Sequence, residues 1–179
     1  MDENEFSKQQ YLALRSEIEG RQSHLFWIVL VGAVGLPVCT YFAAGSQEFL
    51  WVIMPYFALL LILAFIAEQH AMMRAGRFIR EHIEKKCCKD MAWEQWLESN
   101  GAFRRMEAHF FAGFIVVFFL FYFMSVGMAM QWLWHQAGSD PSGQGQYWLY
   151  GAVVTYIIGA VWGFSTLFHH WHAAVSTTD

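Results

Sequence analysis

Residues 49–67 read FLWVIMPYFALLLILAFIA, an unbroken apolar run without Asp, Glu, Lys or Arg. About 20 apolar residues in a helix cross the roughly 30 Å of hydrocarbon in a bilayer. Backbone polar groups inside lipid must be hydrogen-bonded within the segment, so a helix is the expected form. This run therefore predicts a transmembrane helix.

Three further runs have the same character, at residues 25–44, 110–131 and 147–168, and none has a charged residue in its middle. The whole chain is 56% hydrophobic and only 15% charged, whereas soluble domains carry about 25% charged residues. Its 179 residues are enough for one domain. We therefore predict an all-α integral membrane protein with four transmembrane helices.

The positively charged residues are distributed unequally between the linkers. Neither residues 45–48 nor residues 136–146 contain Lys or Arg. All eleven Lys and Arg residues precede the first run or lie between the second and third: Lys8, Arg15, Arg21, Arg74, Arg77, Arg80, Lys85, Lys86, Lys89, Arg104 and Arg105. Because an excess of Lys and Arg marks the cytoplasmic side, both termini are expected in the cytoplasm.

The second transmembrane helix is expected to continue into the cytoplasm as an arm. Residues 69–86 lack proline and separate an apolar arc from a charged one, which is typical of an amphipathic helix. The predicted apolar arc consists of Ala71, Met72, Ala75, Phe78, Ile79, His82 and Ile83. Three partners are possible for the apolar arc: an N-terminal helix that places Tyr11, Leu14 and Ile18 on one face, a short helix after Asp90 that bears Trp93 and Trp96, or the arm of a second copy.

These elements divide the chain into five segments. Residues 1–24 form a cytoplasmic amphipathic N-terminal helix, and 25–68 form transmembrane helices 1 and 2. Residues 69–105 form the cytoplasmic arm with the short Trp-bearing helix, 106–172 form transmembrane helices 3 and 4, and 173–179 form a cytoplasmic tail.

The positive charge of the cytoplasmic segments suits an anionic ligand such as a nucleotide, a phosphate backbone or a lipid headgroup. The candidate ligand-binding residues are Arg15, Arg21, Arg74, Arg77, Arg80, Lys85, Lys86, Arg104 and Arg105. The alternative is that these charges only enforce the topology.

Small residues recur every four positions in the fourth run, at Gly151, Thr155, Gly159 and Gly163. Small residues on one face let membrane helices approach closely. The stripe fits either packing within one chain or association of subunits.

Five histidines fall near the expected inner boundary: His24, His70, His109, His169 and His170. Imidazoles there suit a metal or haem, but residues two apart, such as Glu68 and His70, lie on different sides of a helix, so interfacial positions are favoured over a metal site. No catalytic motif such as G-x-S-x-G, a Walker glycine loop or H-E-x-x-H is present. We expect no catalytic residues, no metal and no cofactor.

Two stretches resemble a known family. They are Tyr11-x-Ala13-Leu14-Arg15-x-Glu17-Ile18, followed by Arg21, and Phe78-Ile79-Arg80-Glu81-His82-Ile83-Glu84. Both resemble small four-span effectors of the bacterial inner membrane in nucleotidyltransferase-linked anti-phage systems, above all the Hailong transmembrane effectors.

That resemblance implies a homotetrameric ion channel held closed by an oligodeoxyadenylate, the signal made by a partner nucleotidyltransferase. Release of the signal would depolarise the infected cell. The oligonucleotide site would use Arg15, Arg21, Arg74, Arg77 and Arg80. The rival hypotheses are a histidine-ligated haem or metal protein of the inner membrane, and a non-catalytic membrane scaffold.

Overall fold

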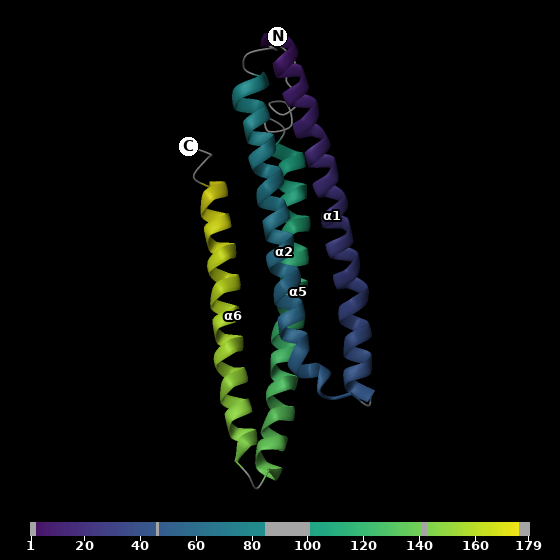
Figure 1. The fold of residues 1–179 in the computed structure, drawn as a ribbon, viewed down its shortest axis with the longest axis vertical. Helices are drawn as coiled ribbons and strands as arrows, with labels where there is room; N and C mark the ends of the chain where they lie inside the picture. Colours follow the sequence, from purple (N-terminus) through teal and green to yellow (C-terminus); the bar gives the residue numbers. More distant parts are fainter. Residues whose placement is uncertain (1–2, 46, 85–100, 141–142, 176–179) are drawn as a thin grey trace. The chain divides into compact units, whose positions relative to one another are not determined.

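The computed structural model describes all residues except 1–2, 46, 85–100, 141–142 and 176–179, and only the backbone of 3, 4, 6, 101–110 and 170–175. The described part contains the helices α1 (Glu3–Gly45), α2 (Leu50–Phe78), α5 (Gly101–Ser139) and α6 (Gln144–Val175), and the π-helix η1 (Ile79–Glu84), as Figure 1 shows. Four helical stretches are long and apolar enough to cross a membrane: Ser7–Gly45, Leu50–Glu84, Phe111–Ser139 and Gln144–His169. The prediction of an all-helical chain with four candidate spans is confirmed.

Two helices continue without a break through positions where the sequence predicts a change from cytoplasmic to transmembrane segment. α1 is one continuous helix through residues 24 and 25, and α5 is one continuous helix through residues 105 and 106. Hydropathy changes at these positions, but no proline interrupts the helix there, and Glu17 and Arg21 pair across one turn of α1 at 2.7 Å. Such pairs stabilise an exposed helical segment. A change from polar to apolar residues therefore did not mark the end of a helix.

The helical arm predicted for residues 69–86 is present as far as Glu84, but its last six described residues form the π-helix η1 instead of an α-helix. A π-helix bonds each N–H to the carbonyl five residues earlier and is uncommon. Residues 85–86 and the predicted Trp-bearing helix lie outside the described residues.

The chain divides into two compact units. One comprises Met1–Trp27 and Ala67–Phe114, and the other comprises Ile28–Ile66 and Ile115–Asp179. In the first unit the apolar arc of the arm is covered by the chain itself, because the side chains at every fourth position are buried: Ala71, Ala75, Ile79 and Ile83. These four positions of the arc therefore need no second copy to remove them from water.

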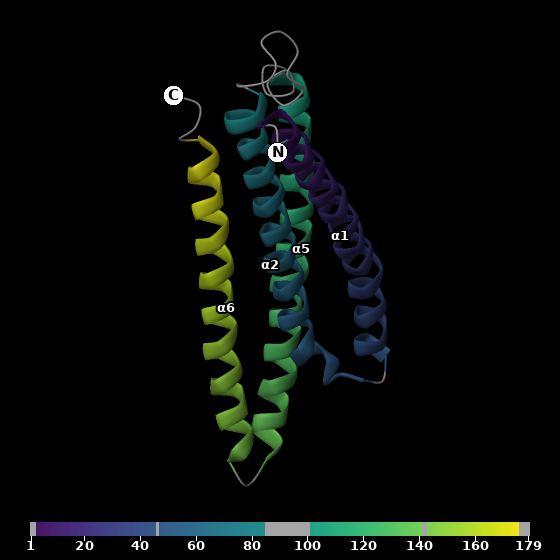
Figure 2. The same ribbon diagram turned by 45° about the horizontal axis from the view of Figure 1, so that its top comes forward.

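The second unit packs parts of four helices. Figures 1 and 2 show α5 and α6 as an antiparallel pair joined by a short turn. Aromatic rings join α2 to α5 through Phe65 and Phe118, whose centroids lie 6.4 Å apart, and join α5 to α6 through Phe119 and Phe164, at 4.6 Å. These contacts fix the positions of α2, α5 and α6 within the unit.

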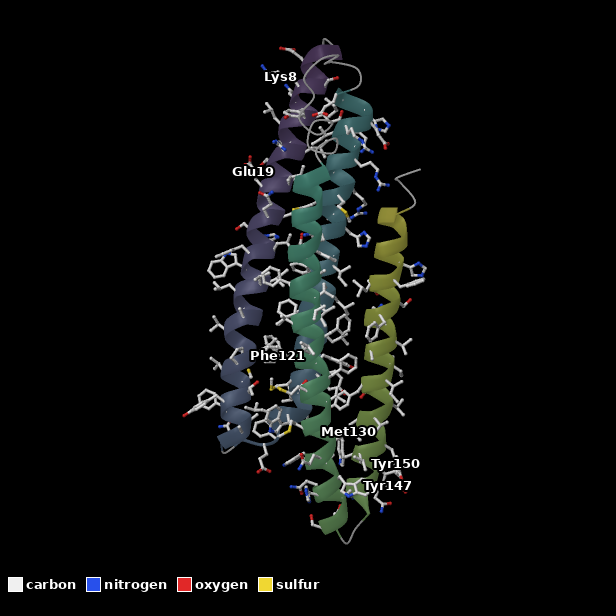
Figure 3. All side chains as sticks on the ribbon, turned by 180° about the vertical axis from the view of Figure 1, so that it is seen from behind. Lys8, Glu19, Phe121, Met130, Tyr147 and Tyr150 are labelled. Carbon is white, nitrogen blue, oxygen red and sulfur yellow. The ribbon has the colours of Figure 1, made fainter. Side chains whose placement is uncertain are left out.

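The connection from α5 to α6 is short, and two glycines described near it have specific roles. Asp140 accepts a hydrogen bond from the backbone N–H of Gly145 at 2.9 Å, as a capping residue does at a helix N-terminus. Gly143 has a φ of +74°, a conformation that residues with a side chain rarely adopt. Tyr147 and Tyr150, labelled in Figure 3, follow in the first turns of α6.

We expect Gly145→Ala to loosen this turn. A Cβ at Gly145 would lie 2.8 Å from the Ala137 Cα, which belongs to the backbone and cannot rotate away. Overpacking of this kind costs about 1–3 kcal/mol. The melting temperature in detergent should fall. It is measured by size-exclusion chromatography of heated samples. Gly138→Ala is the matched control, since nothing lies within 4 Å of its Cβ position. Equal melting of the two variants would contradict the close approach.

Candidate functional site

The charged side of the arm exposes two arginines. Arg74 and Arg77 are both exposed on α2. Within the described part of the chain, neither makes an ion pair. They are three residues apart, so they neighbour each other on the helix surface. Guanidinium groups bind phosphate and carboxylate in a bidentate manner, so this pair has the chemistry of an anion site.

Arg80, the third arginine of this stretch, is in a different environment. Arg80 is a residue of η1, and its side chain is only 25% exposed. Its Nη2 lies 3.4 Å from the Glu81 carboxylate. It also has a contact in addition to that with Glu81. Arg80 is therefore less available to a ligand than Arg74 and Arg77.

An aromatic surface lies beside the arginine pair. The rings of Phe78 and His82 are stacked, with centroids 4.6 Å apart and an interplanar angle of 9°. Both residues are exposed, although the sequence pattern placed them on the apolar arc. Arg74 and Phe78 are four residues apart, so they share one side of the helix. The exposed side of the arm thus combines positive charge with flat rings.

Arg21, another candidate ligand-binding residue, is occupied by carboxylates of the chain itself. Its Nε and Nη2 donate to Glu17 Oε1 at 3.0 and 2.7 Å, and its Nη1 donates to Glu68 Oε2 at 3.0 Å. The other oxygen of Glu68 lies 3.6 Å from His24 Nδ1. Arg21 therefore joins α1 to α2 within the first unit.

If the arm binds an anionic ligand such as an oligonucleotide, neutralisation of Arg21 and of Arg74 should have different effects. Arg21→Gln removes three charge-assisted hydrogen bonds and should lower the melting temperature while ligand affinity changes little. Arg74→Gln should lower affinity while the melting temperature stays unchanged. Thermal melting and binding of a fluorescent oligonucleotide measure the two quantities on the same preparations. The reverse pattern would show that Arg21 faces the ligand and Arg74 supports the fold.

None of the remaining predicted ligand-binding residues has a described side chain that is exposed. Arg15 is half-buried and has a contact within the chain. Arg104 and Arg105 lie in α5, but their side chains are outside the described residues, as are Lys85 and Lys86 entirely. Lys8 and Glu19, labelled on α1 in Figure 3, are both exposed.

The small residues of α6 have different surroundings. Gly159 and Gly163 are buried, and Cβ atoms there would lie 2.8 and 3.3 Å from the side chain of Leu59. Thr155 is exposed and forms a hydrogen bond with Tyr56, whereas Gly151 has nothing within 4 Å of its Cβ position. Two of the four positions thus serve close packing of α6 on α2 within one chain.

Sequence reasoning missed a set of tyrosine hydroxyls that join the helices of the second unit. Tyr122 donates to the Tyr156 carbonyl oxygen at 2.6 Å, and Tyr156 donates to the Val52 carbonyl oxygen at 2.8 Å. Among the described residues, every buried side-chain nitrogen or oxygen has a partner. The available signal was tyrosine within otherwise apolar runs, since a buried Tyr hydroxyl usually finds a partner.

For the histidines, no three His, Cys, Asp or Glu side chains come together as metal ligands in the described part of the chain. The side chains of His109 and His170 are not among those described.

No protein family, curated protein or solved structure matches this chain.

Proposed function

We propose that the chain is an oligomeric ion channel of the bacterial inner membrane that acts as a membrane-depolarising effector in anti-phage defence. A nucleotide or oligonucleotide signal from a partner nucleotidyltransferase gates it by binding the exposed side of the arm at Arg74 and Arg77. The cytoplasmic location of both termini and the tetrameric assembly belong to the same proposal.

The observation that carries the proposal is the exposed arginine pair on a helix that is also a candidate span. α2 runs without a break from Leu50 to Phe78, and Arg74 and Arg77 stand on it with no carboxylate partner among the described residues. A charge used only for topology needs no particular neighbour. A pair on one surface, beside the stacked rings of Phe78 and His82, offers a ligand both phosphate contacts and a stacking surface.

The composition of the spans supports a channel over a proton-coupled carrier. None of the four apolar runs has an Asp, Glu, Lys or Arg at mid-depth. Ionisable residues within spans usually mark proton relays and substrate pathways, whereas a pore that closes by dewetting needs none. A ligand gates such a pore only if it binds one state more tightly than the other.

The test is ion flux through purified protein in liposomes, with and without a short oligodeoxyadenylate. We expect flux that changes when the oligonucleotide is added on the side that exposes the arm. Liposomes without protein serve as one control. Polyphosphate, a polyanion that has phosphate groups but no bases, serves as the other. Absence of flux under every condition would overturn the channel. Flux that no oligonucleotide alters would contradict gating by an oligonucleotide but would still support an ion channel.

A further inference from the structure

Two hydroxyl groups meet on the exposed surface of the second unit. The Tyr56 hydroxyl on α2 and the Thr155 hydroxyl on α6 lie 2.6 Å apart. Tyr56 is 44% exposed and Thr155 is also exposed. The Tyr122 and Tyr156 side chains of the same unit, by contrast, are buried. The pair is therefore a polar point on the outside of a largely apolar surface.

This polar point lies at the depth of the hydrocarbon. Tyr56 is the eighth residue of the apolar run 49–67, and Thr155 is the ninth residue of the run 147–168. At 1.5 Å per residue, they stand about 10–12 Å inside the end of their spans. Since the hydrocarbon is about 30 Å thick, neither residue lies at headgroup level.

The hydrogen bonds leave oxygen acceptors on this surface. The Thr155 hydroxyl lies 3.0 Å from the carbonyl oxygens of both Gly151 and Ala152, so its single proton is directed to the backbone. Tyr56 is then the donor to Thr155, and the phenolic oxygen keeps its lone pairs without a further proton to give. Acceptor oxygens of this kind are suited to water and cations.

Gly151 extends the polar point by one turn. It is exposed, and nothing lies within 4 Å of the position that a Cβ would take. Without a side chain, the helix backbone is uncovered there. The Gly151 carbonyl oxygen accepts a hydrogen bond from the Thr155 hydroxyl at 3.0 Å, and no side chain at Gly151 keeps water from approaching that oxygen.

Large apolar side chains flank the polar point. Ile53 and Leu60 lie one turn away on either side of Tyr56 and are 53% and 62% exposed. On α6, Ile158 and Trp162 are 59% and 62% exposed. A polar site next to an apolar stretch is the arrangement of a pore that conducts when wet and closes when its apolar part loses water.

We infer that the face of α2 and α6 that carries Tyr56, Thr155 and Gly151 lines the ion pathway, where these oxygens contact water and hydrated monovalent cations. The inference rests on the proposed channel. It identifies Leu60 and Trp162 as part of the apolar stretch that closes the pathway.

The test measures aqueous access at this face. In a parent protein with Cys39, Cys87 and Cys88 replaced by Ser, Thr155→Cys is treated in liposomes with a charged, membrane-impermeant methanethiosulfonate. We expect reaction and a several-fold change in cation flux. The matched control is Ile157→Cys, which is 58% exposed on a different side of α6 and should not react. Tyr56→Phe, which removes only the oxygen, should lower the flux several-fold without changing assembly.

The outcomes separate this inference from the proposed function. Flux of the parent protein is measured first, and its absence would remove the channel itself. A conducting parent in which Thr155→Cys is inert, and in which Tyr56→Phe conducts normally, would overturn the inference alone. Oxidative cross-linking of Thr155→Cys between copies, without reaction with the charged reagent, would also overturn it, because the face would then be a dry interface. If Thr155→Cys does not fold, Gly151→Cys replaces it, since open space surrounds that position.

Discussion

Under the proposed function, charge reversal at Arg74 and Arg77 should abolish the response of the channel to its nucleotide signal. Hydrogen bonds to charged groups contribute about 1.5–3 kcal/mol each, so losing two phosphate contacts should weaken binding by at least about 100-fold. The Arg74→Glu, Arg77→Glu variant should also show a shallower dependence of binding on salt, because fewer counterions are released. Fluorescence anisotropy of a labelled oligodeoxyadenylate at several salt concentrations measures both effects.

Two controls distinguish ligand contact from topology. Arg74→Lys, Arg77→Lys keeps both charges but loses bidentate geometry, and it should bind with intermediate affinity. Lys8→Glu reverses an exposed charge on α1 and should bind normally. A reporter fused to each terminus shows whether the orientation has changed. Normal binding by the doubly reversed variant would mean that these arginines only orient the chain.

Gly32→Leu should prevent α1 from packing in the second unit. A Cβ at Gly32 would lie 2.6 and 2.7 Å from two ring atoms of Phe118 and 3.4 Å from Leu61. Phe118 is buried, so its ring has little space to move. Forcing a larger side chain into such a contact costs about 1–3 kcal/mol or more. We expect a large fall in the melting temperature or loss of the folded fraction in detergent.

The cause can be isolated with a compensating change. Gly32→Leu combined with Phe118→Ala should melt above Gly32→Leu alone, because the removed ring makes room for the new side chain. Gly113→Leu on α5 is the control, since nothing lies within 4 Å of its Cβ position. A Gly32→Leu protein that melts like the parent would show that α1 is held by contacts other than this one.

The candidate spans could be predicted because they depend on composition alone. A run such as 49–67 is apolar on all sides, so a helix formed by it has no polar face to turn toward water. The extent of the helices could not be predicted in the same way. Backbone hydrogen bonding in α1 continues through the polar residues before Leu25, and hydropathy reports only the surroundings of a residue. The sequence pattern of residues 79–84 predicts an ordinary amphipathic α-helix and does not distinguish it from the π-helix η1.

The candidate site was predicted as a set of charges, but not as an arrangement. The positions of Arg74 and Arg77 follow from helical spacing, which is local. The pairing of Arg21 with Glu68 joins residues 47 positions apart, and local periodicity carries no information about it. The same holds for Tyr156 and Val52, which are 104 positions apart. The exposure of Phe78 and His82 also depends on which side of the end of α2 and of η1 the rest of the chain covers.

The short connections have a consequence for biosynthesis. α1 ends at Gly45 and α2 begins at Leu50, while α5 ends at Ser139 and α6 begins at Gln144. For a nascent chain inserted from the side of its basic residues, only two short segments without Lys or Arg have to be translocated. Each helix pair can therefore leave the translocon as a hairpin, and the first pair can be in the membrane before the ribosome has made the second.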